Sequence, residues 1–174
     1  TGELALLERP HLAPRPWDAH KGRYGHVGIR AGSLGMSGAA VLAALGALRS
    51  GAGLVTVLTE AAVRAEVAAQ VPEAMVRVWD GAVPEGIDVL LVGPGGVSEI
   101  PAWSGPLVLD ASALQEGQGP RWLQRPDTLI TPHPGEFARL FGLPKPEGTD
   151  ERLSQARQAA AGGACRRLPR LGET

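Results

Sequence analysis

Residues 27–58 read VGIRAGSLGMSGAAVLAALGALRSGAGLVTVL, and this stretch decides the fold. Residues 27–31 and 54–58 have the length and apolar character of strands, whereas residues 38–50 form an apolar run of helical length. Two strands joined by one helix make a βαβ unit, in which the strands run parallel. The helix is apolar nearly all round, so we expect it to be buried.

The same alternation continues along the rest of the chain. A helix is predicted over residues 60–70, and further strands are predicted over residues 74–78, 89–92, 107–109 and 128–130, with helices over 136–141 and 150–160. The short, continuously apolar runs are typical of parallel strands that are covered on both faces. The sequence therefore predicts a three-layer α/β/α domain with a mostly parallel sheet.

The composition is that of an ordinary globular protein of one domain. The chain has 174 residues, of which 44% are hydrophobic and 20% charged, and its net charge is -1. Without a basic excess, and with only 4% aromatic residues, nucleic acid is not an expected partner. No apolar run reaches the length of a membrane span, so no membrane partner is expected. The single Cys165 fits a reducing compartment such as the cytoplasm and suggests no catalytic role.

Three segments are expected along the chain. Residues 1–19 are rich in proline and predict a linker or N-terminal arm, and residues 20–161 carry the alternating pattern of the domain. Residues 162–174 form an atypical, basic tail at the point where an α/β pattern calls for another strand. We therefore expect the domain to be incomplete at its C-terminus.

A glycine-rich turn follows the first predicted strand. Residues 32–40 read GSLGMSGAA, with Gly35 at the centre and Ser37 as the expected N-cap of the following helix. Free N–H groups at such a helix start favour an anion such as a phosphate. The spacing matches neither the dinucleotide fingerprint nor the phosphate loop, and a tight strand-to-helix turn is the alternative interpretation.

Three more strand ends carry residues suited to a ligand site. Gly-Pro-Gly-Gly at 93–96 would expose bare backbone, Asp110 could bind a hydroxyl or a hydrated cation, and His133 stands between two prolines that restrict its backbone. Each has a plain structural alternative: a turn, an N-cap and an exposed turn histidine. Because ligands gather at the carboxyl ends of parallel strands, four such motifs in succession favour a binding site.

The remaining histidines and basic residues carry weaker signals. His20 and Lys21 precede the first strand and could contact phosphates, although a solvated entry loop is the simpler interpretation. His11 and His26 have no partner at metal-ligand spacing, so no metal site is predicted from the sequence.

Six motifs follow one another along the chain in an order typical of one family. They are HKGRYG at 20–25, AGSLGMSGAA at 31–40, LRSGAGLV at 48–55, GPG at 93–95, LDASAL at 109–114 and TPHPGEF at 131–137. Together they resemble the ADP/ATP-dependent NAD(P)H-hydrate dehydratases, which are carbohydrate-kinase-like domains of the ribokinase-like superfamily. The resemblance runs from about residue 19 to about residue 161.

The resemblance implies a ribokinase-like fold and a nucleotide-repair lyase. Such an enzyme removes water from hydrated NADH or NADPH at the expense of ADP, or of ATP in some members, and gives NAD(P)H, AMP and phosphate; Mg²⁺ is the expected ion. The resemblance also implies an upstream NAD(P)H-hydrate epimerase domain and a homo-oligomer as partners. The residues that it implies hold the substrate are Ala40, Gly95, Gly96 and His133, with possible support from His20, Lys21, Gly35, Asp110 and Glu136.

The chain departs from this family after about residue 161. Family members continue with a strand that ends in a Lys-Gly loop and with a Gly-Thr-Gly-Asp-like helix start, which supplies the catalytic aspartate; neither motif is present here. The sequence thus predicts a truncated or frame-shifted chain that is marginally stable and lacks dehydratase activity alone. Two other functions stay open: a non-catalytic nucleotide-binding or assembly module, and a ribokinase-like vitamin kinase.

Overall fold

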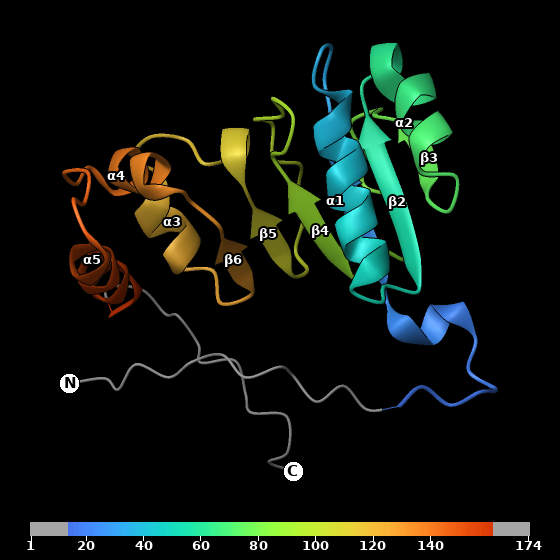
Figure 1. Cartoon of the computed structure of the whole chain (residues 1–174), viewed down its shortest axis with the longest axis horizontal. Helices are drawn as coiled ribbons and strands as arrows, with labels where there is room; N and C mark the ends of the chain where they lie inside the picture. The colour runs from blue at the N-terminus through green and yellow to red at the C-terminus, as the bar shows by residue number, and fades with distance from the viewer. Residues whose placement is uncertain (1–13, 162–174) are drawn as a thin grey trace.

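One parallel sheet forms the centre of the protein in the computed structural model, which describes residues 14–161 (Figure 1). Its strands are β1 (His26–Arg30), β2 (Leu54–Thr59), β3 (Met75–Val78), β4 (Val89–Val92), β5 (Leu107–Leu109) and β6 (Thr128–Ile130). Their order across the sheet is β3-β2-β1-β4-β5-β6, and every neighbouring pair is parallel. The predicted strands and the predicted parallel sheet are therefore confirmed.

The first layer of helices covers one face of the sheet. Side chains alternate between the faces of a strand, so Ile29 of β1 and Val57 and Leu91 beside it in the register point to the same side. There they pack with α1 (Ser37–Arg49) and α2 (Arg64–Gln70), the latter preceded by the short helix η2 (Ala61–Val63). This buried cluster of valine, isoleucine and alanine side chains anchors the β1-α1-β2 unit.

The second layer covers the opposite face over β4, β5 and β6. Leu90, Leu107 and Leu109 alternate with the residues of the first face and pack against Trp122 and Leu140. The helices of this layer are α3 (Gly119–Leu123) and α4 (Pro134–Phe141), and α5 (Thr149–Ala161) lies next to α3. In Figure 1 these helices stand at the β6 end of the sheet, whereas α1 and α2 stand at the β2–β3 end. The three-layer α/β/α architecture is confirmed.

Helix α1 is buried on one side only, so the prediction of a helix buried all round is wrong. Ala40, Val41 and Ala44 face the core, whereas Leu42 is 72% exposed. Apolar residues on every side of a helix do not show which side meets the sheet, because that choice depends on the neighbouring strands. The sequence also gave no sign of three short helices, which are η1 (Lys21–Tyr24), η3 (Ala111–Ala113) and α3.

Strand β6 is an edge strand within the described part of the chain, where it pairs with β5 alone. Leu129 at its middle is 59% exposed. Open strand edges pair with other chains, so we expect Leu129→Lys to reduce self-association, measured by light scattering, with a change in stability of at most about 0.5 kcal/mol. Leu42→Lys, on an exposed helix position, is the matched control and should leave association unchanged. Equal effects of both substitutions would contradict a role for the strand edge.

Part of the predicted arm and the whole predicted tail lie outside the described residues. These are residues 1–13, with His11, and residues 162–174, with Cys165. Among residues 14–161, no helix combines the length and the apolar character needed to cross a membrane.

Candidate functional site

The strand order creates a switch point between β1 and β4. From β1 the chain builds outward to β2 and β3, and from β4 it builds in the other direction to β5 and β6. The loops that follow β1 and β4 therefore leave the sheet on either side of this point. In open parallel sheets, such a switch point at the carboxyl ends of the strands is where ligands bind.

Two of the predicted motifs contact each other at the switch point. The Gly32 N–H donates a hydrogen bond to the carbonyl oxygen of Pro94 at 3.0 Å, and the Ser33 hydroxyl donates to the carbonyl oxygen of Gly95 at 2.8 Å. The glycine-rich turn after β1 and the Gly-Pro-Gly-Gly turn after β4 thus form one continuous surface of backbone. We call these two turns, residues 32–36 and 93–96, the glycine loops.

Gly95 is required by the close approach of the glycine loops. Its φ of +76° is in the left-handed region, and a Cβ there would lie 2.8 Å from the Met36 carbonyl oxygen and 2.9 Å from the Gly32 Cα. Both features disfavour any residue with a side chain. The glycine loops can therefore present N–H and carbonyl groups to a ligand at short range, without side chains in between.

The start of α1 differs from the prediction. Met36 occupies the N-cap position and Ser37 is the first helical residue, and no side chain caps the helix. The expected Ser37 cap is therefore wrong. An uncapped helix start leaves N–H groups available for an anion.

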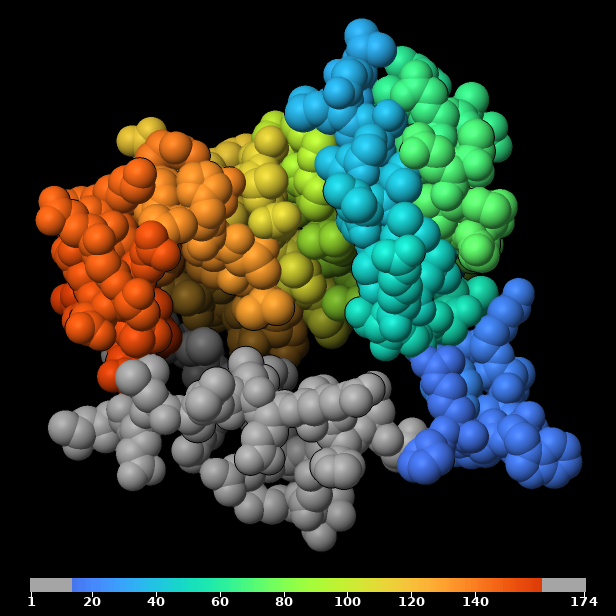
Figure 2. All heavy atoms as spheres, in the orientation of Figure 1, coloured from blue at the N-terminus to red at the C-terminus, as the bar shows by residue number. Residues whose placement is uncertain are grey.

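The loop before α1 is bonded to the residue that follows β2. The Leu34 N–H donates to a carboxylate oxygen of Glu60 at 3.2 Å. Figure 2 shows this loop standing out at the top of the molecule.

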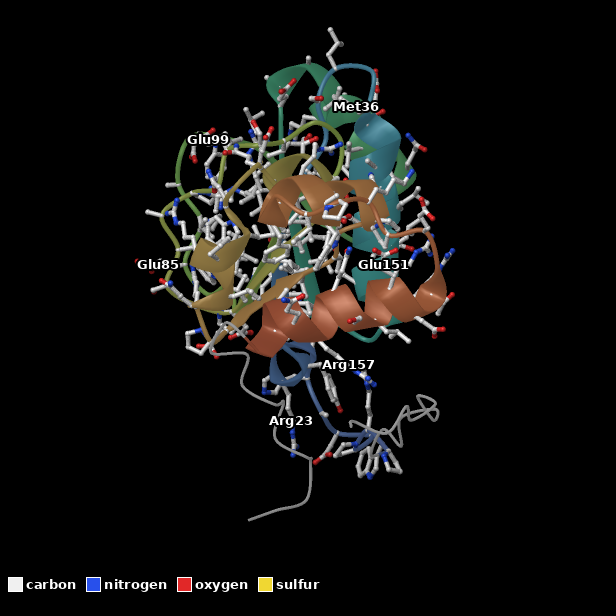
Figure 3. All side chains as sticks on the ribbon, turned by 90° about the vertical axis from the view of Figure 1, so that its left-hand side faces the viewer. Arg23, Met36, Glu85, Glu99, Glu151 and Arg157 are labelled. Atoms are coloured by element: carbon white, nitrogen blue, oxygen red, sulfur yellow. The ribbon has the colours of Figure 1, made fainter. Side chains whose placement is uncertain are left out.

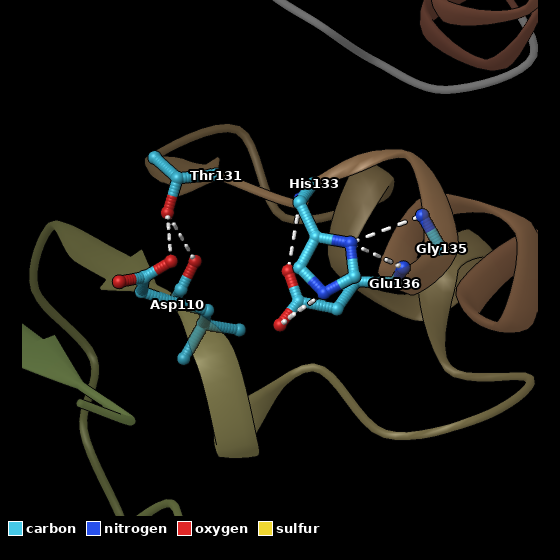
Figure 4. A network of polar contacts seen from close by, with 6 residues as sticks. Asp110, Thr131, His133, Gly135 and Glu136 are labelled. Atoms are coloured by element: carbon cyan, nitrogen blue, oxygen red, sulfur yellow. Dashed lines mark hydrogen bonds and ion pairs between the residues drawn. The ribbon is translucent and has the colours of Figure 1, made fainter. Parts of the chain in front are cut away.

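Asp110 links the ends of β5 and β6. Its Oδ1 accepts a hydrogen bond from the Thr131 hydroxyl at 2.8 Å (Figure 4). Asp110 occupies the N-cap position of η3, as in the alternative interpretation, but its side chain makes no capping hydrogen bond. The next residue, Ala111, has a φ of +47°, which is unusual for a residue with a side chain and marks a strained backbone. Such strain is found at ligand sites.

His133 caps helix α4 with its own ring. Its Nδ1 accepts from the Gly135 N–H at 3.0 Å and from the Glu136 N–H at 3.3 Å, and its backbone N–H donates to Glu136 Oε2 at 2.8 Å (Figure 4). Because Nδ1 is an acceptor, the ring proton is on Nε2. Nε2 lies 3.4 Å from Glu136 Oε1, and the histidine side chain is 62% exposed. Glu136 thus holds the ring at both ends, with Nε2 facing Glu136 Oε1, while much of the side chain stays exposed.

The predicted site residues divide into three groups by their position. The carboxyl edge of the sheet holds Gly35, Gly95, Gly96, Asp110, His133 and Glu136. Ala40 follows in α1 but is fully buried, and its Cβ lies next to Gly32. His20 and Lys21 precede β1 and so lie at the amino edge, across the sheet from the glycine loops. Figure 3 shows this separation, with Met36 at one end of the molecule and Arg23 at the other.

The sequence reasoning missed Arg30, the last residue of β1. It is only 6% exposed, its NH1 group donates to the Leu58 carbonyl oxygen at 3.4 Å, and its Cζ lies 5.0 Å from the centre of the Trp79 ring. Burial lowers the pKa of Arg30, whereas Glu99 and Glu60 act in the opposite direction. The sequence did contain a signal for Arg30, because a charged residue ends an apolar strand there.

Within residues 14–161, no group of three or more His, Cys, Asp or Glu side chains is placed to hold a metal ion. Glu136 uses its oxygens on His133, and Asp110 uses one oxygen on Thr131. These residues therefore do not by themselves fit Mg²⁺, and no chemical step is assigned to that ion here.

Comparison with known proteins points to one group. Residues 27–165 match the Carb_kinase family, described as NAD(P)H-hydrate dehydratase. An ADP-dependent (S)-NAD(P)H-hydrate dehydratase of Bacillus subtilis is 34% identical over 168 residues, which cover 88% of this chain and 60% of the relative. A bifunctional NAD(P)H-hydrate repair enzyme of Coxiella burnetii is 41% identical over 152 residues, which cover 77% of this chain and 30% of the relative.

Solved structures agree with the sequence relatives. The ADP/ATP-dependent NAD(P)H-hydrate dehydratase of Bacillus subtilis, co-crystallized with ATP and Mg²⁺, superposes with a TM-score of 0.72 at 32% identity, over 86% of this chain and 59% of that one. A ribokinase-like superfamily protein of Enterococcus faecalis has a TM-score of 0.68 at 28% identity. The chain spans about 60% of the dehydratase that it matches. With its sheet order, its glycine loops and these matches, the chain belongs to the NAD(P)H-hydrate dehydratase family.

Proposed function

We propose that the carboxyl edge of the sheet binds hydrated NADH or NADPH, and that the protein removes water from this ligand in an ADP-dependent reaction that gives NAD(P)H, AMP and phosphate. The observation that carries the proposal is the row of four neighbouring strand ends. The glycine loops, Asp110 and His133 follow β1, β4, β5 and β6, which are adjacent in the sheet. At the usual strand spacing this row is about 14 Å long, which suits an extended dinucleotide better than a small alcohol.

The described residues supply a binding surface with distinct chemical parts. The N–H groups of Gly32, Leu34, Met36 and Gly93 are bonded within the chain. The remaining N–H groups of the glycine loops and those of the uncapped α1 start suit the phosphates of the dinucleotide. The second carboxylate oxygen of Asp110 can accept a hydrogen bond from a ligand hydroxyl. The Nε2–H of His133 can donate one that it shares with Glu136 Oε1, 3.4 Å away. Ala40 is fully buried, so it would not touch the ligand. It would contribute to the site by packing against Gly32 of the glycine loops.

The chemistry of the substrate explains why a nucleoside diphosphate is consumed. Hydroxide is a poor leaving group, but a phosphoryl group moved from ADP to the ring hydroxyl makes a good one and leaves AMP. The lone pair of the ring nitrogen then expels phosphate, and loss of a proton from the adjacent carbon restores the double bond. The described residues bind and orient the hydrate; we assign none of them to the phosphoryl transfer.

The wider setting of the protein follows from its relatives and its composition. Several relatives are bifunctional NAD(P)H-hydrate repair enzymes, so we propose that this protein works with an NAD(P)H-hydrate epimerase. We also propose ADP or ATP with Mg²⁺ as the co-substrate, a homo-oligomer as the assembly, and the cytoplasm as the compartment. These proposals rest on the family and on the single cysteine, not on a contact in the described residues.

Calorimetric titration of the 174-residue chain tests the binding step. We expect the hydrate of NADPH to bind at least about tenfold more tightly than NADPH, because only the hydrate offers a ring hydroxyl to Asp110 and His133. Equal affinities for the two would contradict the proposal and favour a general nucleotide-binding module. Binding of a thiazole alcohol without binding of the hydrate would contradict it in favour of a vitamin kinase.

A further inference from the structure

Thr59, the last residue of β2, is a polar residue in an apolar environment. It is fully buried, and so are Val55, Val57 and Leu58 of the same strand. Burying a hydroxyl is unfavourable unless the hydroxyl makes a hydrogen bond. The Thr59 hydroxyl makes one, because it donates to the carbonyl oxygen of Gly32 at 3.0 Å. This bond joins the end of β2 to the first of the glycine loops.

Gly32 is packed between Thr59 and Ala40. A Cβ on Gly32 would lie 2.9 Å from Thr59 Oγ1 and 2.9 Å from the Ala40 Cβ, and the φ of Gly32 is +83°. Only glycine suits this combination of close contact and left-handed backbone. Glycine also adopts more backbone conformations than other residues do, so the bond from Thr59 is needed to select one orientation of the peptide that follows Gly32.

The orientation of that peptide fixes the direction of the Ser33 N–H. In a trans peptide the C=O and the N–H lie in one plane and point in opposite directions. Because the Gly32 C=O points to Thr59 of β2, the Ser33 N–H points away from β2, which is the direction of β4. Among residues 14–161 this N–H has no hydrogen-bond acceptor. It is therefore a free donor on the side of the turn where the second glycine loop lies.

We propose that Thr59 is a positioning residue of the site at the carboxyl edge of the sheet. Its hydroxyl orients the Gly32–Ser33 peptide so that the Ser33 N–H donates to a phosphate of the bound dinucleotide. Thr59 is fully buried and does not touch the ligand, and Ala40 acts on the same glycine by packing against it. The identity of the ligand rests on the proposed function, whereas the orientation of the peptide does not.

Three substitutions in β2 test the role of the Thr59 hydroxyl. Thr59→Val removes the hydroxyl at nearly constant volume, and Thr59→Ser keeps it. Thr56→Val is the matched control, because Thr56 is 2% exposed and its hydroxyl lies 2.7 Å from His26 Nε2 rather than at the glycine loops. Each valine variant loses one buried hydrogen bond, so both melting temperatures should fall by about 2–4 °C.

Ligand affinity separates positioning from stability. In calorimetric titrations with hydrated NADPH, we expect Thr59→Val to bind at least about tenfold more weakly than the original chain. Thr59→Ser and Thr56→Val should bind within about threefold of the original affinity. Equal weakening by Thr59→Val and Thr56→Val would show that the Thr59 hydroxyl matters for stability alone, and would contradict the proposal.

Inorganic pyrophosphate tests the same inference without the hydrate. In amide NMR spectra, we expect pyrophosphate to shift the Ser33 resonance of the original chain in a saturable way, with an affinity that Thr59→Val lowers at least about tenfold and Thr59→Ser retains. This result, without binding of the hydrate to the original chain, would contradict the proposed function and support the role of Thr59. Equal affinity of the original chain and Thr59→Val for the hydrate would support the function and overturn the role of Thr59, as would a Ser33 resonance that pyrophosphate leaves unchanged.

Discussion

Replacing Gly93 by alanine is expected to destabilise the protein by about 3 kcal/mol or more. Gly93 directly follows β4 and has a φ of +127°, and a Cβ there would overlap the carbonyl oxygen of Asp110, which directly follows β5. The backbone of Asp110 cannot move away easily, because its N–H donates to the Val92 carbonyl oxygen in the sheet. Against a usual total stability of about 5–15 kcal/mol, the loss is large. Urea unfolding followed by circular dichroism measures it.

Gly35 provides the matched control for this substitution. It also has a left-handed backbone, with a φ of +79°, but a Cβ there would meet no atom within 4 Å. Gly35→Ala should therefore cost only the backbone strain of about 1–2 kcal/mol. A similar loss of stability for Gly35→Ala and Gly93→Ala would contradict the view that the close contact between the ends of β4 and β5 forces glycine at position 93.

His133→Ala is expected to have the largest effect on ligand binding. The alanine removes the Nε2–H donor that we assign to the ligand, so the affinity for hydrated NADPH should fall at least about tenfold in a calorimetric titration. The same change removes the acceptor for the N–H groups of Gly135 and Glu136. Loss of that cap should lower the free energy of unfolding by about 1 kcal/mol.

His133→Ser separates the two roles of the histidine. A serine hydroxyl is a good N-cap acceptor, so the stability should return to within about 0.5 kcal/mol of the original chain. The hydroxyl is too short to reach where Nε2 reaches, so ligand affinity should stay as low as in His133→Ala. Recovery of both stability and affinity in His133→Ser would contradict a direct contact between the imidazole and the ligand, and would leave the cap as its only role.

Local patterns predicted most of the secondary structure and the positions of the site motifs. The strands at 89–92, 107–109 and 128–130 agree with β4, β5 and β6, because a short apolar run between turn residues has few other ways to bury itself. The glycine loops, Asp110 and His133 were found because each follows such a run. Residues that follow parallel strands share one edge of the sheet whatever the details of packing are.

Other features depend on contacts between segments that are distant in the sequence. Ser37 had the chemistry of an N-cap, yet in the structure Met36 occupies that position and Ser37 is already helical. His133 serves as a cap only because its ring folds back onto α4.

The sequence by itself determined the parallel α/β layering and the row of strand-end motifs, since both follow from the spacing of apolar and turn residues. Only the tertiary structure decided that Ala40 is covered and that Arg30 is buried beside Trp79. The physical reason is that burial and electrostatic environment come from neighbours in space, and a linear pattern specifies only the neighbours along the chain.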